Sequence, residues 1–201
     1  MKKFCAKAML AVLACSALVT ATAADEGEHA GWKVRESVEV SDHYLFNTDT
    51  MVDGATILIR DFNNRIVRGT ITSSALNPEA AYSIWIVVFN RPNHCAIANE
   101  CGLGDLGNPN VEVSVFWGGG FIADSNGYAN TAFSIVPGHT DRELFAVPGD
   151  YGLSNLKGAE IHIVLRTHGQ AGFAGSVATQ IGTANGACDG CENQFASVHV
   201  P

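Results

Sequence analysis

The chain has 201 residues, and its 12 Lys and Arg are outnumbered by 20 Asp and Glu, which gives a net charge of −8. A protein that binds DNA or RNA needs a basic surface, so this composition excludes nucleic acid as an expected partner. Hydrophobic residues make up 47% of the chain, which is enough to bury the core of one domain.

Residues 1–23 have the pattern of a secretory signal peptide. Three lysines precede an apolar run from Ala8 to Val19, and Ala21-Thr22-Ala23 supplies the small-residue cleavage pattern. The run is shorter than the roughly 20 residues that cross a bilayer, and no other stretch is apolar enough, so we expect no membrane span. We therefore expect a secreted or periplasmic protein, cleaved near Ala23. Its net charge would fall from −8 to −11, because the removed segment holds three lysines and no acidic residue.

One alternative for the N-terminus stays open. Cys15 follows Val12-Leu13-Ala14, so cleavage before Cys15 would produce a lipoprotein instead. After the favoured cleavage site, residues 24–33 are mostly polar and are expected to form a flexible mature N-terminus. The remaining residues, 34–201, have the length of a single domain.

Four of the six cysteines lie beyond residue 23. An even number of cysteines in an exported protein predicts disulfide bonds. Both close pairs lie in loops rich in Gly, Asn and Asp, which favours the pairing of Cys95 with Cys101 and of Cys188 with Cys191. Two alternatives stay open: a redox-active pair in Cys188-Asp-Gly-Cys191, and a zinc site that uses all four cysteines.

Strand patterns dominate the predicted domain, because period-two alternation recurs and no stretch of ten or more residues shows a helical stripe. Asn126-Gly127 and Asn63-Asn64 lie between strand patterns and predict two hairpins. Trp85 lies in the most apolar strand and is expected in the core. Short strands with glycine-rich turns predict an all-β, single-domain antiparallel β-sandwich, Ig-like or jelly-roll-like. The expected strands are 34–40, 55–60, 66–73, 82–90, 111–117, 120–124, 128–136, 159–167 and 194–200.

Two connections are long for such a fold. Residues 91–110 hold two cysteines, which indicates an ordered loop, and residues 137–158 include Arg142–Phe145, where one helical turn is expected. Long connections are usually functional or disordered. One alternative for the function is therefore an extracytoplasmic hydrolase whose active site is formed by these two loops.

Two segments carry a resemblance to other proteins. Tyr82–Cys95 has the pattern Y-x-x-W-x-V-V-F-N-x-P-x-x-C, and Leu156–Gly169 contains the run EIHIVLRTH. Over roughly residues 66–200 the chain resembles a group of uncharacterised exported bacterial proteins with a β domain. The resemblance implies export and a single secreted β domain. It implies no activity, so the function has to be inferred from the residues themselves.

The predicted strand that holds the EIHIVLRTH run carries the best candidate site. Its odd-numbered residues are apolar up to Leu165 and face one side, whereas Glu160 and His162 face the other. Imidazole and carboxylate suit zinc or copper, so Glu160 and His162 are candidate metal ligands. His168 and His199 are further candidates. The simpler alternative is a solvated sheet face on which Glu160, His162 and Arg166 pair locally.

No catalytic motif is apparent, because the sequence lacks a G-x-S-x-G elbow, an H-E-x-x-H pair and a G-x-G-x-x-G loop. We therefore expect a secreted, non-catalytic binding or structural module that needs no cofactor and recognises a protein or a carbohydrate. Two alternatives remain. One is a copper- or zinc-binding protein or metalloenzyme that uses His162 and Glu160, and the other is the loop-built hydrolase.

Overall fold

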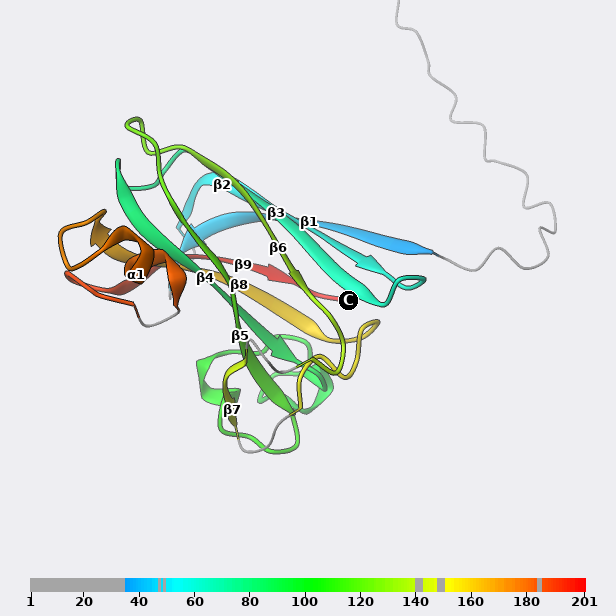
Figure 1. The fold of residues 1–201 in the computed structure, drawn as a ribbon. Coiled ribbons are helices and arrows are strands. Elements are labelled where there is room, and N and C mark those ends of the chain that lie inside the picture. Colours follow the sequence, from blue (N-terminus) through cyan, green and yellow to red (C-terminus); the bar gives the residue numbers. More distant parts are fainter. Residues whose placement is uncertain (1–34, 47, 49, 140–142, 148–150, 184–185) are drawn as a thin grey trace, which may run out of the picture. The chain divides into compact units, whose positions relative to one another are not determined.

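The structure, a computed structural model, describes residues 35–46, 48, 50–139, 143–147, 151–183 and 186–201. The expected signal peptide, its cleavage site and the segment 24–33 lie outside these residues. The described part is built mainly from strands (Figure 1). The strands are β1 (Glu36–Leu45), β2 (Met51–Asp61), β3 (Ile66–Ser73), β4 (Ala80–Phe89), β5 (Val113–Ile122), β6 (Ala129–Ile135), β7 (Glu143–Val147), β8 (Glu160–Gln170) and β9 (Glu192–His199). The helices are α1 (Val177–Gly182) and the 3-10 helices η1 (Pro92–His94) and η2 (Leu103–Asp105).

All of these strands belong to one antiparallel sheet with the order β6-β3-β2-β1-β9-β8-β4-β5-β7. The sheet is narrowest between β1 and β9, where only Tyr44 with Ala196 and Leu45 with Phe195 are in register. It curls until β5 lies against β6 (Figure 1). The prediction of an all-β, antiparallel fold is confirmed. The sheet has two halves, β6-β3-β2-β1 and β9-β8-β4-β5-β7, which are joined at the narrow pairing of β1 with β9.

The inner side of the curled sheet encloses the main core. Leu58 and Phe133 from one half belong to the same buried cluster as Ile86 and Ile163 from the other, and none of the four is more than 5% exposed. Burying each such side chain contributes about 1.5–3 kcal/mol. Gly69 in β3 lies directly beneath the ring of Phe133, where any Cβ would overlap the ring. The core therefore depends on a glycine in the middle of this strand.

Strand β5 is longer than predicted, because the patterns at 111–117 and 120–124 join into one strand. Its register shifts opposite Ile84 and Trp85, so the glycines between the two patterns continue the strand. Residues 143–147 form β7, which pairs with β5, in place of the expected helical turn. The helix α1 was not predicted, since its six residues are too few to display a helical stripe.

Of the two predicted hairpins, one is confirmed. Asn63 and Asn64 turn between β2 and β3, where the carboxylate of Asp61 accepts their backbone N–H groups at 3.1 and 2.9 Å. Asn126-Gly127 also forms a turn, and Gly127 has a φ of +76°. The strands on either side of that turn do not pair, because β5 pairs with β4 and β7 whereas β6 pairs with β3. A local turn signal does not decide which strands form hydrogen bonds.

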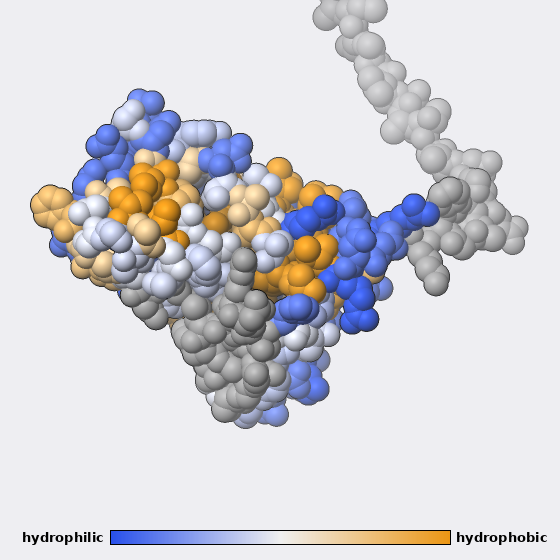
Figure 2. Space-filling model, viewed as in Figure 1, coloured by the Kyte–Doolittle hydropathy of each residue, from blue (hydrophilic) through white to orange (hydrophobic). Residues whose placement is uncertain are grey.

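Apolar side chains also reach the surface, and Figure 2 shows them as separate patches within hydrophilic surface. Val38 and Val40 of β1 are 61% and 67% exposed, and Val40 is in register with the exposed Ile57 of β2. They lie on the outward face of the half that contains β1. Among the described helices, none has the length and apolar character needed to cross a bilayer.

Candidate functional site

The candidate site lies on the outer face of β4, β8 and β9. The predicted division of β8 into two faces agrees with the structure, since Ile161 and Ile163 enter the main core while His162 points outward. The outer face is not the solvated surface that the simpler alternative expects, because the connection between β4 and β5 folds over it. The residues buried where this connection meets the sheet are Phe89, Cys95, Cys101, Val111 and Val113.

Three neighbouring strands supply the floor of a groove. Val164 of β8 is in register with Ala196 of β9 and with Trp85 of β4, and His162 is in register with Val87. Paired residues of an antiparallel sheet point to the same side, so these five side chains share one face. The floor is apolar except at His162.

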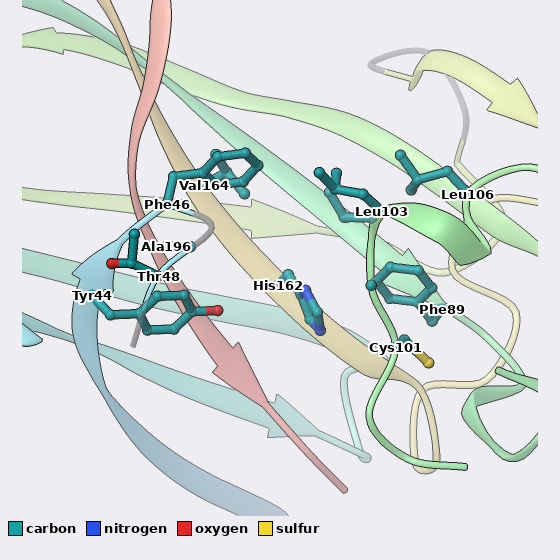
Figure 3. A pocket seen from close by; sticks show the side chains of 12 residues that line it. Tyr44, Phe46, Thr48, Phe89, Cys101, Leu103, Leu106, His162, Val164 and Ala196 are labelled. Atoms are coloured by element: carbon teal, nitrogen blue, oxygen red, sulfur yellow. The ribbon is translucent and has the colours of Figure 1, made fainter. Parts of the chain in front are cut away.

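Two loops form the walls of the groove. On one side Tyr44 lies at the end of β1, and Phe46 and Thr48 follow the strand. The Phe46 N–H donates to a β9 carbonyl oxygen at 2.9 Å. On the other side Leu103 and Leu106 belong to the connection between β4 and β5 (Figure 3). The groove between the walls has a volume of about 290 Å³. A smaller hollow of about 100 Å³ shares part of this lining and extends it towards the indole ring of β4.

The wall that carries the two leucines is held by a disulfide and an aspartate. Cys95 and Cys101 are joined, with their Cα atoms 5.3 Å apart, and this is one of the two pairs that the loop composition favours. The carboxylate of Asp105 accepts the backbone N–H groups of Ala96 and Gly102 at 2.8 and 2.9 Å. These bonds close the loop on itself, so this wall is formed before any ligand arrives, as is usual for binding pockets.

His162 and Glu160 form a hydrogen-bonded pair at the floor. The His162 Nε2 and Glu160 Oε1 atoms are 2.6 Å apart, and the backbone N–H of Cys101 donates to the same oxygen at 2.9 Å. The Glu160 side chain is 1% exposed and the His162 side chain 15%. Because a carboxylate only accepts hydrogen bonds, this geometry places a proton on Nε2. Nδ1 of a neutral His162 ring is then left to accept a hydrogen bond from a ligand.

The four histidine and glutamate candidates from the sequence do not converge. His168 lies at the other end of β8 from Glu160, about 26 Å away at the usual rise of a strand. His199 is in register with an inward residue of β8, so it faces the inner side of the sheet and not the side of His162. The structure brings Glu160 and His162 together and separates the other two candidates from them.

The second disulfide joins Cys188 to Cys191, whose Cα atoms are 5.2 Å apart. Both sulfur atoms lie against His168, and within the described ranges these three residues are the only group of three potential metal ligands. The other disulfide lies at the opposite end of β8. The backbone N–H of Cys101 donates a hydrogen bond to Glu160, which is the first residue of that strand. This separation excludes the zinc site that uses all four cysteines.

A buried polar cluster on the inner side, where β1 and β9 separate, is not apparent from the sequence. His43 Nε2 lies 3.0 Å from Thr56 Oγ1, and the Ser197 hydroxyl donates to the same oxygen at 3.0 Å. His199 is 2% exposed, and neither ring nitrogen has a hydrogen bond within the described part of the chain. Burial lowers the pKa of His43 and of His199 to about 4, and for His199 the charge of Arg60 acts in the same direction. Both rings are therefore neutral at pH 7.

Arg60 is fully buried beside this cluster. Its Nε and Nη2 atoms donate to the two carboxylate oxygens of Glu39 at 2.7 and 3.1 Å, and Nη1 donates to the Leu156 carbonyl at 3.1 Å. A buried guanidinium requires such pairing, since an unpaired buried charge is costly. An arginine at an inward position of the predicted strand 55–60 is the sequence signal that would have revealed the cluster.

Trp85 lies on the outer face of β4 and not in the main core, so that prediction is wrong. The ring is only partly buried, its Nε1 donates to Ser83 Oγ at 3.1 Å, and the Arg166 guanidinium lies 5.4 Å from the ring centroid. Strand β4 is apolar on both faces because the connection after it covers its outer face. Strand hydrophobicity alone therefore does not identify the side that enters the main core.

Comparison of the chain with protein-family models, with curated proteins and with solved structures found no match. The chemistry of the groove is therefore the basis for a function. Its lining offers one imidazole, one phenol and one aliphatic hydroxyl among apolar side chains, and none of the described lining residues is a serine or carries a free thiol. A few polar groups among apolar side chains suit the binding of a small ligand.

Proposed function

We propose that this protein is a secreted or periplasmic, non-catalytic binding module that holds a hydroxylated ring, such as a sugar ring, in the groove over β4, β8 and β9. The observation that carries the proposal is the imidazole of His162, which is fixed by the buried carboxylate of Glu160 between apolar walls. Few polar groups in a mostly apolar concave lining are typical of ligand sites.

The groove favours a neutral ring that carries hydroxyl groups. The apolar side chains of Phe46, Leu103 and Val164 would contact the body of the ring, and Nδ1 of His162 would accept one hydroxyl hydrogen. An anionic ligand is disfavoured by the carboxylate of Glu160 beneath the floor and by the net charge of −8. The volume of about 290 Å³ suits a single ring, since pockets for larger ligands extend to about 1,000 Å³.

The burial of Glu160 supports a functional role for the pair. The side chain is almost completely buried, and its Oε2 atom has no hydrogen bond among the described residues. A buried carboxylate usually contributes less to stability than an apolar side chain of similar size. Buried polar groups that are incompletely satisfied call for an explanation other than packing, and the orientation of His162 towards a ligand provides one.

The two alternative functions have less support. A metal ion on Nε2 of His162 would break the hydrogen bond to Glu160, and no third ligand lies close to the pair in the part of the chain that the structure describes. A hydrolase that forms a covalent intermediate on serine or cysteine would need that nucleophile beside the imidazole, and the described groove lining supplies neither a serine nor a free thiol.

We also propose that the two halves of the sheet pack face to face in the manner of a β-sandwich. Residues from both halves share one buried cluster, and only two residue pairs join β1 to β9. The sheet then acts as a rigid support, with the groove on the outside of one layer.

Nuclear magnetic resonance titration with methyl glycosides tests the binding function. We expect saturable shifts of the backbone signals of Val87, Val164 and Leu103, and an affinity at least about tenfold lower for His162→Ala, which corresponds to about 1.4 kcal/mol. His94→Ala is the matched control. His94 is an exposed histidine in the connection between β4 and β5, and it does not line the groove. Shifts confined to other surfaces, or no saturable binding of any glycoside, would contradict the proposal.

A further inference from the structure

The Cys188–Cys191 disulfide lies directly above a buried histidine. His168 is 0% exposed, and its Nδ1 atom is 3.4 Å from Cys191 Sγ and 3.8 Å from Cys188 Sγ. The two cysteine residues differ in exposure, since Cys188 is exposed and Cys191 is half-buried. The backbone N–H of Asp189 donates to the His168 carbonyl at 3.2 Å, which holds the loop between the two cysteines against the end of β8.

A chain of hydrogen bonds fixes the proton of His168 on the nitrogen nearer the disulfide. The indole N–H of Trp85 donates to Ser83 Oγ at 3.1 Å, and Ser83 Oγ lies 2.9 Å from His168 Nε2. A serine oxygen that accepts from an indole can donate its own O–H to Nε2. The backbone carbonyl of Gly186, which lies 3.2 Å from Cys188 Sγ and acts on the His168 ring as a hydrogen-bond acceptor, favours a proton on the nitrogen that faces the disulfide. Nε2 is then the acceptor and Nδ1 carries the hydrogen of the neutral ring. Burial lowers the pKa of His168, which keeps the ring neutral at pH 7.

We propose that Cys188–Cys191 is a redox-active disulfide that exchanges with thiols, with Cys188 Sγ as the attacked sulfur and the Nδ1–H of His168 as the group that stabilises Cys191 as it leaves. This activity is independent of the groove. The co-reactant is a thiol, either a small one or a cysteine of another protein in the same compartment.

The exchange proceeds in two balanced steps. An incoming thiolate attacks Cys188 Sγ, a new S–S bond forms to it, and the bond between the two protein sulfurs breaks. The electron pair leaves on Cys191 Sγ, where the Nδ1–H of His168 donates a hydrogen bond to the new thiolate. A second thiolate then attacks the incoming sulfur and releases Cys188 as a thiolate. The two external thiols become a disulfide, and the two protons that they lost on ionisation are taken up by Cys188 and Cys191.

The acidic side chains next to the pair do not favour a thiolate. Asp189 lies between the two cysteines and Glu192 follows them, and both side chains are exposed carboxylates. The nearby cation is Arg166, which bonds to Asn193 at 3.0 Å and whose charge acts on the His168 ring. Within hydrogen-bond distance of Cys191 Sγ, the group that can stabilise a leaving thiolate is His168. The Cys95–Cys101 disulfide offers an internal comparison, because both of its residues are buried, at 8% and 7% exposure. An exposed sulfur beside a hydrogen-bond donor is expected to exchange faster than a buried one.

Reduction of the full-length oxidised protein by glutathione, with each disulfide followed by alkylation and mass spectrometry, tests the proposal. We expect Cys188–Cys191 to be reduced at least about ten times faster than Cys95–Cys101. We also expect the trapped glutathione adduct on Cys188. Equal reduction rates for the two disulfides, or an adduct mainly on Cys191, would overturn the proposal.

Two substitutions of His168 separate its chemical role from simple exposure of the disulfide. His168→Leu removes the donor and should slow reduction of Cys188–Cys191 about tenfold, whereas His168→Asn retains an N–H at the position of Nδ1 and should restore most of the rate. The reduction rate of the buried Cys95–Cys101 disulfide, measured in the same sample, should rise if a variant unfolds. If His168→Leu unfolds the protein, Ser83→Ala replaces it. This change removes the hydroxyl that contacts both His168 Nε2 and the indole N–H of Trp85, leaves the imidazole in place, and should also slow the exchange. An unchanged rate in a folded variant without the donor contradicts the role of His168.

Discussion

The backbone N–H of Cys101 donates a 2.9 Å hydrogen bond to Oε1 of Glu160, 59 residues further along the chain. The same oxygen is 2.6 Å from Nε2 of His162. One carboxylate oxygen therefore joins a wall of the groove to the polar group on its floor. A change at Glu160 should disturb the loop and the imidazole together.

Replacing Glu160 by Gln tests this connection. The amide oxygen of Gln can still accept the Cys101 N–H, but the charge that holds the His162 ring is lost. We expect urea unfolding to show a loss of about 1–3 kcal/mol, as for other buried groups that lose a hydrogen-bond partner. Glu100→Gln is the control, because Glu100 is an exposed residue in the loop between β4 and β5. Its free energy of unfolding should stay within about 0.5 kcal/mol of that of the parent. Equal losses in the two variants would show that the buried bond has no special role.

Removing the Cys95–Cys101 disulfide should affect binding more than stability. The two cysteines are six positions apart, so the loss of stability from the double serine variant should stay below the ~3 kcal/mol expected for a 15-residue loop. The wall of the groove would lose its covalent closure, and glycoside affinity should fall in the titration described above. The Cys188→Ser, Cys191→Ser variant is the control, because that pair lies at the other end of β8. A similar loss of affinity in the control would contradict the role given to the wall.

The strands follow from the sequence because alternation reports which residues share a face. The pattern of β8 predicts its inward and outward residues, and Asn63-Asn64 predicts the β2–β3 hairpin. Pairing between distant strands is a different matter. The turn at Asn126-Gly127 separates two strands that belong to different halves of the sheet, and no local signal indicates that separation.

The candidate site is only partly visible in the sequence. Glu160 and His162 are found because they lie two residues apart on one strand. The loop between β4 and β5 covers Glu160 and His162. The sequence does not show that residues 91–112 fold back over this face of the sheet. The inner cluster depends on the separation of β1 from β9, a long-range feature that places His43 of one strand near His199 of the other.

The N-terminus is predicted to be processed. Cleavage after Ala23 should leave a protein that begins at Ala24 or Asp25 and carries no lipid, because the small-residue pattern precedes this point. The intact mass of the exported protein measures this directly. A diacylated N-terminal Cys15 would establish the lipoprotein alternative instead.

Trp85→Ala should cost less than a core substitution. If Trp85 were in the main core, its truncation to alanine would lower the free energy of unfolding by about 3–5 kcal/mol. Its place on the outer face, with one hydrogen bond to Ser83 and the guanidinium of Arg166 over the ring, leads us to expect about 1–3 kcal/mol. Phe195→Ala is the comparison, because Phe195 is 2% exposed in the main cluster and should show the full core cost. A larger loss for Trp85→Ala than for Phe195→Ala in urea unfolding would contradict the placement.

The stability of the protein should fall as the pH is lowered from about 6.5 to about 4. Burial lowers the pKa of His43 and His199 from 6.5 to about 4, so between these values the unfolded chain binds protons that the folded protein does not. Stability is therefore highest above about pH 6.5, decreases through this window, and loses nothing more from these groups below it. Each histidine should contribute up to about 3 kcal/mol.

The pH range over which stability is lost distinguishes these two histidines from Asp61 and Asp124. Backbone hydrogen bonds lower the pKa of Asp61 and of Asp124 below the ordinary value of 3.8, so their contributions are lost only at still lower pH. Urea unfolding between pH 7 and pH 4 should therefore show a steep slope for the parent and a shallow one for the His43→Gln, His199→Gln variant. His94→Gln, at an exposed histidine, should keep the slope of the parent. A double variant as steep as the parent would place the acid sensitivity outside the inner cluster.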